Sequence, residues 1–154
     1  MPTFHLTTHW TIHNTPERIW EYLQNVERYP EWWPGFLGAR VVEKGGSDGL
    51  GASVECRVRG TLPYVFKFRT TVLEIERPRL LRLRAVGGLE GMGVWTLEPN
   101  GPATHVTYQW DIQATNPILN IMAAFPPAKS FLAGSHDRVM AEGGRNLERL
   151  LASR

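Results

Sequence analysis

A histidine near the C-terminus has the residue type and the surroundings that acid–base chemistry requires. When residues 127–152 are placed on a helix at steps of about 100°, His136 lies at the centre of the apolar face. Within about 60° of it on that wheel lie Phe125, Leu132, Val139, Met140, Gly143, Leu147 and Leu150. A neutral imidazole in a dry cavity can orient a carbonyl or enol group, or act as a general acid or base. His136 is therefore the candidate catalytic residue. The alternative is a buried histidine that has no catalytic role and is satisfied by Tyr108 or by a backbone carbonyl.

Three other histidines have a regular spacing, but strand geometry argues against a metal site. His5, His9 and His13 share one face of a predicted strand, where residues four apart are separated by about 13 Å. The ligands of one zinc ion all lie about 2.1 Å from it. We therefore expect no metal and no cofactor. Residues 88–93 read as a hairpin turn rather than a phosphate-binding loop, and Cys56 as an inert thiol of the core or of a pocket wall.

The aromatic content predicts a pocket for a hydrophobic small molecule. The chain has six Trp, six Phe and four Tyr, and strand alternation turns many of these rings to the inner face. They are more bulky rings than a small core needs, which favours a cavity over a solidly packed interior, the alternative. The candidate ligand-binding residues are Trp10, Trp33, Phe36, Phe66, Phe68, Trp95, Tyr108, Trp110, Met122, Phe125, His136 and Met140.

The same alternation predicts a basic patch on the outer face of three consecutive strands. Its members are Arg57, Arg59, Lys67, Arg69, Arg82 and Arg84. Such a patch can dock an acidic protein, for example an acyl carrier protein, or an anionic membrane. The simpler interpretation is a solvated face that keeps the sheet from associating, with Glu55 and Glu98 among the cations. The net charge of +2 gives no reason to expect a nucleic-acid partner.

The elements that must position these residues follow from periodicity and turn signals. A strand over 3–13 is followed by a helix from Pro16 to about Asn25, opened by a capping side chain and a proline. Pro30 and Pro34 permit at most a short second helix between 28 and 36. A short apolar helix is expected from 117 to 125, and the longest helix from 127 to 152. Between them we expect antiparallel strands over 38–44, 51–60, 63–76, 79–87, 91–99 and 103–115.

Seven such strands must curl, because each pair of neighbours adds right-handed twist. One amphipathic helix covers only part of the concave face. The part left uncovered becomes the cavity. Its mouth is expected where the loop 30–37 meets the segment 117–127, since both mix aromatic residues with proline or glycine.

The motifs in this order resemble the START-like (SRPBCC) superfamily, and within it the polyketide cyclase/dehydrase and lipid-transport family. The resemblance covers nearly the whole chain and rests on HWTI, TPERIWEYLQNVERYPEWWPG, GTLPYVFKF, VLEIERPRLLRLRA, GVWTLEP, HVTYQWDI and HDRVMAEGGRNLERLL. It implies an α+β helix-grip fold, in which a seven-stranded curved antiparallel sheet wraps around a long C-terminal helix, with two short helices between the first two strands. It implies no catalytic residue, because this scaffold serves carriers, sensors and cyclases alike.

Three functions follow as expectations. The first is a carrier or sensor that binds a lipid, polyketide or aromatic molecule in the cavity. The second is a polyketide-type cyclase/dehydratase in which His136 transfers protons during ring closure. The third is a partner-interaction module that uses the basic patch.

Length and composition place the chain among ordinary globular proteins. We expect residues 1–154 to form a single domain. One cysteine rules out an internal disulfide. The N-terminus lacks the basic start and apolar run of a secretory signal, and no stretch approaches 18 uninterrupted apolar residues. We therefore expect a cytoplasmic protein that is not an integral membrane protein.

Overall fold

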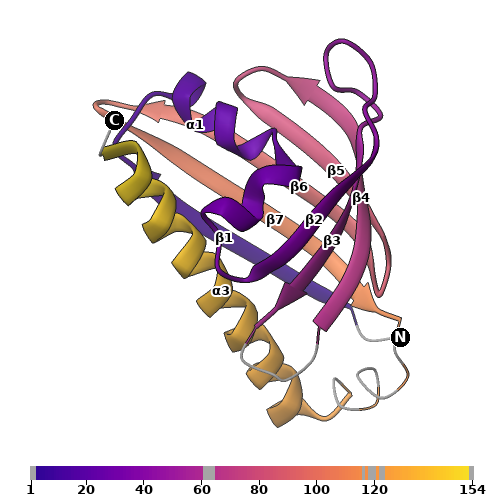
Figure 1. The fold of residues 1–154 in the computed structure, drawn as a ribbon. Helices are drawn as coiled ribbons and strands as arrows, with labels where there is room; N and C mark the ends of the chain where they lie inside the picture. The colour runs from indigo at the N-terminus through magenta and orange to yellow at the C-terminus, as the bar shows by residue number, and fades with distance from the viewer. Residues whose placement is uncertain (1–2, 61–64, 116, 118–120, 122–123, 153–154) are drawn as a thin grey trace.

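Seven antiparallel strands and one long helix dominate the structure, a computed structural model that describes residues 3–60, 65–115, 117, 121 and 124–152. The strand order is β1-β7-β6-β5-β4-β3-β2. The strands are β1 (Phe4–Ile12), β2 (Phe36–Glu43), β3 (Ser53–Arg59), β4 (Val65–Glu76), β5 (Leu80–Gly87), β6 (Leu89–Asn100) and β7 (Ala103–Ala114). The helices are α1 (Pro16–Leu23), the 3-10 helix η1 (Val26–Glu31) and α3 (Pro126–Ala152) (Figure 1).

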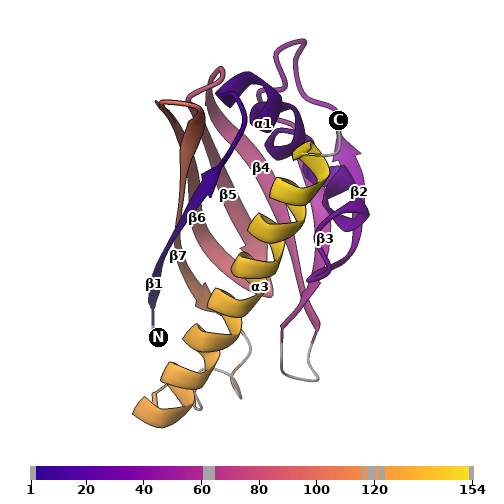
Figure 2. The ribbon, with the colours of Figure 1, turned by 90° about the vertical axis from the view of Figure 1, so that its left-hand side faces the viewer.

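The sheet is curved, and α3 lies along its concave side (Figure 2). Strands β2 to β7 pair in sequence order. β1 does not pair with β2; it pairs with β7, so that β1 and β2 are the two edge strands. α1 and η1 join β1 to β2 and lie near the C-terminal end of α3 (Figure 2). The predicted α+β helix-grip fold is confirmed. The short helix predicted over 117–125 falls largely outside the described residues.

The connection from β1 to β2 is built by its capping residues and prolines. Thr15 Oγ1 accepts a hydrogen bond from the Arg18 backbone N–H at 3.3 Å, and Pro16 occupies the first turn of α1, where its missing N–H is no loss. Asn14 Oδ1 accepts a hydrogen bond from the N–H of Thr15, so Thr15 is the N-cap of α1. The second helix is a 3-10 helix that contains Pro30 and begins at Val26, earlier than predicted.

Two indoles hold α3 in place, one from β1 and one from the connection between η1 and β2. Trp10 Nε1 donates to the Met140 carbonyl oxygen at 3.1 Å, and Trp33 Nε1 donates to the Val139 carbonyl oxygen at 2.8 Å. These rings lie where α3 has Gly143 and Gly144. A Cβ on Gly144 would stand 2.7 Å from Trp10 Nε1, and one on Gly143 would stand 2.8 Å from Trp33 Cδ2. The glycine pair therefore lets the helix backbone approach the two rings closely.

The first turns of α3 do not pack in the way that the helical wheel predicts. The buried residues of α3 begin at Met140. Before it, Phe131 is 54% exposed, and Phe125, just ahead of the helix, is 63% exposed. The prediction that Phe125 faces the interior is wrong, because α3 extends past the end of the sheet at this point (Figure 2).

Candidate functional site

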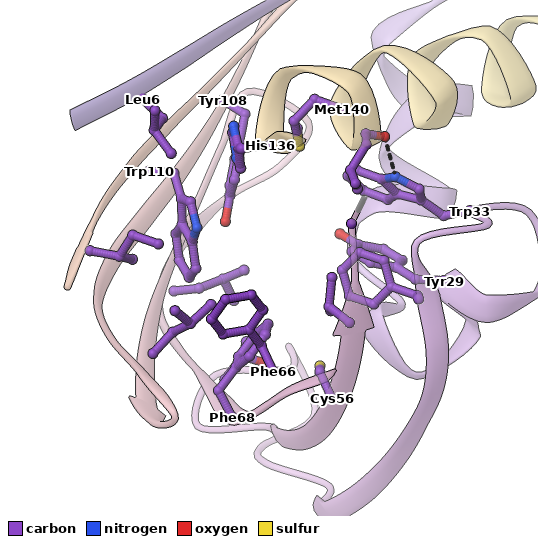
Figure 3. A pocket seen from close by; sticks show the side chains of 18 of the residues that line it. Leu6, Tyr29, Trp33, Cys56, Phe66, Phe68, Tyr108, Trp110, His136 and Met140 are labelled. Atoms are coloured by element: carbon purple, nitrogen blue, oxygen red, sulfur yellow. Dashed lines mark hydrogen bonds between the residues drawn. The ribbon is translucent and has the colours of Figure 1, made fainter. Parts of the chain in front are cut away.

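A cavity of ≈160 Å³ lies between α3 and the concave face of the sheet (Figure 3). It is lined by nine of the twelve predicted ligand-binding residues, namely Trp33, Phe36, Phe66, Phe68, Trp95, Tyr108, Trp110, His136 and Met140. The strand alternation that predicted the aromatic residues of β4, β6 and β7 holds, since all five of them line this space. Of the predicted mouth, residues 118–120, 122 and 123 lie outside the described residues.

The other three predicted residues have different positions. Trp10 is buried but does not line the cavity; its ring packs behind the lining, with centroids 5.6 Å from Trp33 and 5.2 Å from Trp95. Phe125 is exposed and also does not line the cavity. Met122 lies outside the described residues. Trp10 is therefore a supporting residue of the wall rather than part of its surface.

Several lining residues escaped the sequence analysis, and Tyr29 is the most informative of them. Its phenol donates a hydrogen bond to the Leu23 carbonyl oxygen at 2.5 Å. Because Tyr29 belongs to a 3-10 helix with an internal proline, no strand or α-helical period points to it. Leu6, by contrast, alternates with Phe4 and Trp10 on β1, so the period that identified Trp10 could have found it.

His136 lines the cavity, and one of its ring nitrogens is unsatisfied. The side chain is 17% exposed, and its Nδ1 atom is buried without a hydrogen-bond partner among the described residues. Asp137 Oδ1 is 3.8 Å from this Nδ1 atom, beyond hydrogen-bonding distance. Burial lowers the pKa of His136, and the charge of Asp137 offsets only part of this effect. The imidazole is therefore neutral at neutral pH, and the expected partner, Tyr108 or a backbone carbonyl, does not satisfy Nδ1.

The other titratable groups of the cavity keep their protons. Burial raises the pKa of Cys56 to about 12, and it raises the pKa values of Tyr29 and Tyr108 well above the usual phenol range. No Asp, Glu, Lys or Arg is among the described lining residues. The described wall therefore carries no formal charge at neutral pH, and its tyrosines are hydrogen-bond donors rather than bases.

One wall of the cavity is a row of flat rings. The Tyr108 ring centroid lies 4.2 Å from that of Trp95 and 5.7 Å from that of Trp110. Gly93 makes room for this row, because a Cβ there would stand 2.9 Å from Trp110 Cε3 and would also collide with the Tyr108 hydroxyl. Figure 3 shows Tyr108 and Trp110 across the cavity from Tyr29 and Trp33.

The surface histidines each contact a different residue on another element. His5 Nδ1 lies 2.8 Å from Asp111 Oδ1, and His13 Nδ1 lies 2.9 Å from Glu148 Oε1. His9 Nδ1 lies 3.2 Å from His105 Nε2, a cross-strand pair that only the β1–β7 register reveals. In the described part of the chain, no three His, Cys, Asp or Glu residues are grouped so that they could hold a metal ion.

The six predicted cations are exposed, but carboxylates lie among them. Strand register places Arg57 opposite Lys67 and Arg69 opposite Glu55. Glu55 pairs with Arg40 at 2.7 Å and with Arg69 at 3.4 Å, and hydrogen bonding from Arg40 is the main cause of its lowered pKa. A second pair joins Glu74 to Arg82 at 3.1 Å. The remaining members, Arg59 and Arg84, are also exposed. The face is therefore mixed in charge rather than purely basic.

Solved structures share this architecture at low sequence identity. A protein from Thermus thermophilus aligns with a TM-score of 0.77 at 15% identity and covers 98% of this chain and 100% of its own. A START superfamily protein from Mycobacterium smegmatis aligns with a TM-score of 0.76 at 18% identity, and the alignment covers 95% of this chain and 98% of that protein. The Zhui aromatase/cyclase from Streptomyces sp. R1128 aligns with a TM-score of 0.75 at 14% identity, and the alignment covers 96% of this chain and 92% of that protein. Identities this low show the fold alone.

Three further findings concern membrane crossing and sequence similarity. No helix within the described ranges is long and apolar enough to span a bilayer. No curated protein matches the sequence. Residues 3–152, however, match the family described as polyketide cyclase / dehydrase and lipid transport. Because this match covers nearly the whole chain, the chain belongs to this family.

Proposed function

We propose that this protein is a carrier or sensor that binds a hydrophobic small molecule in the cavity between α3 and the sheet. The observation that carries the proposal is an interior space of ≈160 Å³ walled by apolar and aromatic side chains. At about 24 cal/mol per Å³, leaving such a space empty costs about 4 kcal/mol relative to a filled interior. A guest that fits would recover part of this free energy, and the family to which the chain belongs includes lipid transport in its description.

The proposal is tested by filling the cavity with the protein's own side chain. Val58 lines the cavity, so Val58→Phe would place a ring where the ligand is proposed to bind. Leu73 is 40% exposed on the neighbouring strand β4, so Leu73→Phe adds the same ring outside the cavity. Titration of naphthalene, followed by tryptophan fluorescence, should show binding that Val58→Phe abolishes and Leu73→Phe retains. Equal affinity in both variants would contradict the proposal.

A second experiment identifies the natural occupant. Protein purified under native conditions would be extracted with organic solvent and the extract analysed by mass spectrometry. An apolar compound present in stoichiometric amount supports binding in the cavity. Repeated recovery of ligand-free protein with an acidic protein attached would instead favour the partner-interaction hypothesis.

A cyclase/dehydratase is the second candidate, and the unpartnered Nδ1 of His136 favours it. A neutral imidazole could take a proton from the carbon that attacks a carbonyl in an aldol ring closure, and return it to the resulting alkoxide to give a hydroxyl. It could then take a second proton from the same carbon and deliver it to that hydroxyl, which leaves as water. Tyr108, which stays protonated, could donate a hydrogen bond to that carbonyl oxygen. His136→Ala separates the two functions, because a carrier should retain most of its ligand uptake whereas a cyclase should lose turnover.

The acidic-partner hypothesis for the outer face stays a prediction, weakened by the ion pairs of Glu55 and Glu74. If Arg57→Glu together with Arg69→Glu left binding of an acyl carrier protein unchanged, the hypothesis would fail. The single ligand-binding domain over residues 1–154 and the cytoplasmic location likewise stay predictions.

A further inference from the structure

We propose that the ligand is an uncharged, flat molecule of one or two rings with a hydroxyl or carbonyl group, and that His136 and Tyr108 bind this group. The inference rests on the proposed binding function and names the class of molecule that the same cavity accepts. It follows from four properties of the wall, namely charge, shape, size and unsatisfied polar atoms.

The charge of the wall excludes ionised ligands. No described lining residue carries a formal charge at neutral pH, because none is an acid or a strong base and His136 is neutral. An ion that leaves water for such a site loses several kcal/mol of hydration with no counter-charge to replace it. A carboxylate would need a protonated His136 beside it, and burial of the imidazole opposes that protonation. Fatty-acid anions and sulfonates are therefore poor ligands.

The shape of the wall favours a flat ligand. Trp95, Tyr108 and Trp110 form a row with angles of 32° and 26° between successive ring planes. Figure 3 shows Tyr29 and Trp33 on the opposite side of the same space. A ring between two aromatic surfaces gains offset-stacked or edge-to-face contacts on both sides. A flexible alkyl chain would lose rotamer freedom there without those contacts.

The size of the cavity limits the ligand to one or two rings. Its volume of ≈160 Å³ is close to the about 150 Å³ of an apolar cavity that accepts benzene. A long polyketide chain or a two-chain lipid is much larger than this space. Such molecules would require the wall to move outward.

The unsatisfied polar atoms point to one polar group on the ligand. Tyr29 and Trp33 already donate to backbone carbonyl oxygens. His136 Nδ1 is buried without a partner among the described residues. A buried polar atom left unsatisfied is rare in native structures, because it forfeits the hydrogen bond that it made to water. Depending on which nitrogen carries the proton, Nδ1 accepts from a hydroxyl or donates to a carbonyl.

Tyr108 supplies a second polar atom in the same space. Its hydroxyl lies above Gly93, the position where a Cβ would collide with it, and its raised pKa keeps it protonated. The phenol can therefore donate to the oxygen of the ligand while His136 accepts or donates. The two residues come from different elements, β7 and α3.

The test compares naphthalene, 2-naphthol and 2-naphthoate at pH 7 on wild type, His136→Leu, Tyr108→Phe and the surface control His9→Leu. In wild type, 2-naphthol should bind about three- to tenfold more tightly than naphthalene, the range for one net hydrogen bond. 2-Naphthoate should bind about 100-fold more weakly or worse, because its charge must be desolvated. His136→Leu should bring the ratio of 2-naphthol to naphthalene affinity close to one, Tyr108→Phe should lower it, and His9→Leu should leave it unchanged.

The outcomes separate this inference from the proposed function. If none of the three compounds binds wild type, the proposed function fails. If all three bind but with equal affinity, or if the affinity ratio survives in both His136→Leu and Tyr108→Phe, the inference fails while the proposed function stands. The ratio within each variant does not depend on the variant's overall stability, so a partly destabilised variant still gives an answer.

Discussion

The interior of this protein has two ends that differ in how their side chains fill space. Near α1, aliphatic residues pack completely; Ile19, Leu23 and Leu147 are each 0% exposed. At the other end, beside the part of α3 that precedes Met140, the cavity is lined largely by aromatic residues. Phe66, Tyr108 and His136 are only partly buried because they border this cavity. One helix and one sheet enclose both ends. From this difference we expect the end near α1 to contribute more to the stability of the fold, and the end with the cavity to hold the proposed ligand.

The largest effect is expected when side-chain volume is removed at each end of the core. Leu147→Ala should lower the free energy of unfolding by about 2–5 kcal/mol, because it opens a new void in a filled region. Leu132→Ala should lower it by less than about 1 kcal/mol, since Leu132 borders a space that already exists. Urea unfolding measures both. Equal losses would show that the two ends do not differ in packing.

A smaller effect is expected where α3 meets the two indoles. Gly143→Ala should destabilise the protein by about 1–3 kcal/mol, because the added methyl overlaps the Trp33 ring. Gly134→Ala in the same helix has no neighbouring atom within 4 Å of the added Cβ and should stabilise the protein by about 0.5–1 kcal/mol. Thermal unfolding of the pair checks the prediction. A Gly143→Ala protein as stable as Gly134→Ala would mean that the close contact does not form.

The smallest effect concerns pH at the cavity end. Because burial lowers the pKa of His136 below its ordinary value of 6.5, protons bind the unfolded chain more readily than the folded one. Stability is therefore lost as the pH falls below 6.5, and the loss ends once the pH passes below the folded-state pKa. Wild type should lose up to about 1 kcal/mol relative to His136→Leu between pH 7 and 5.5. Parallel stability profiles would show that His136 is not buried in its neutral form.

The sequence predicts the sheet, the helix and nine of the cavity-lining residues, because strand and helix periodicity assign each side chain to a face. Sequence-based prediction fails for residues whose position depends on more than the face of the strand or helix to which they belong. The helical wheel gives the angle of Phe125 but not how far the sheet extends along the helix axis. Trp10 points inward as predicted, yet its hydrogen bond to α3 places it behind the lining. Tyr29 belongs to a 3-10 helix without a usable period, and the His9–His105 pair depends on strand register.

The most direct measurement is a crystal structure of the protein grown with 6-bromo-2-naphthol, whose bromine is located by anomalous scattering. We expect one bromine peak inside the cavity, with the ligand ring against Tyr108 and Trp110 and its hydroxyl oxygen within hydrogen-bonding distance of His136 Nδ1. A cavity filled by the protein's own side chains, with bromine only on the outer surface, would contradict the account.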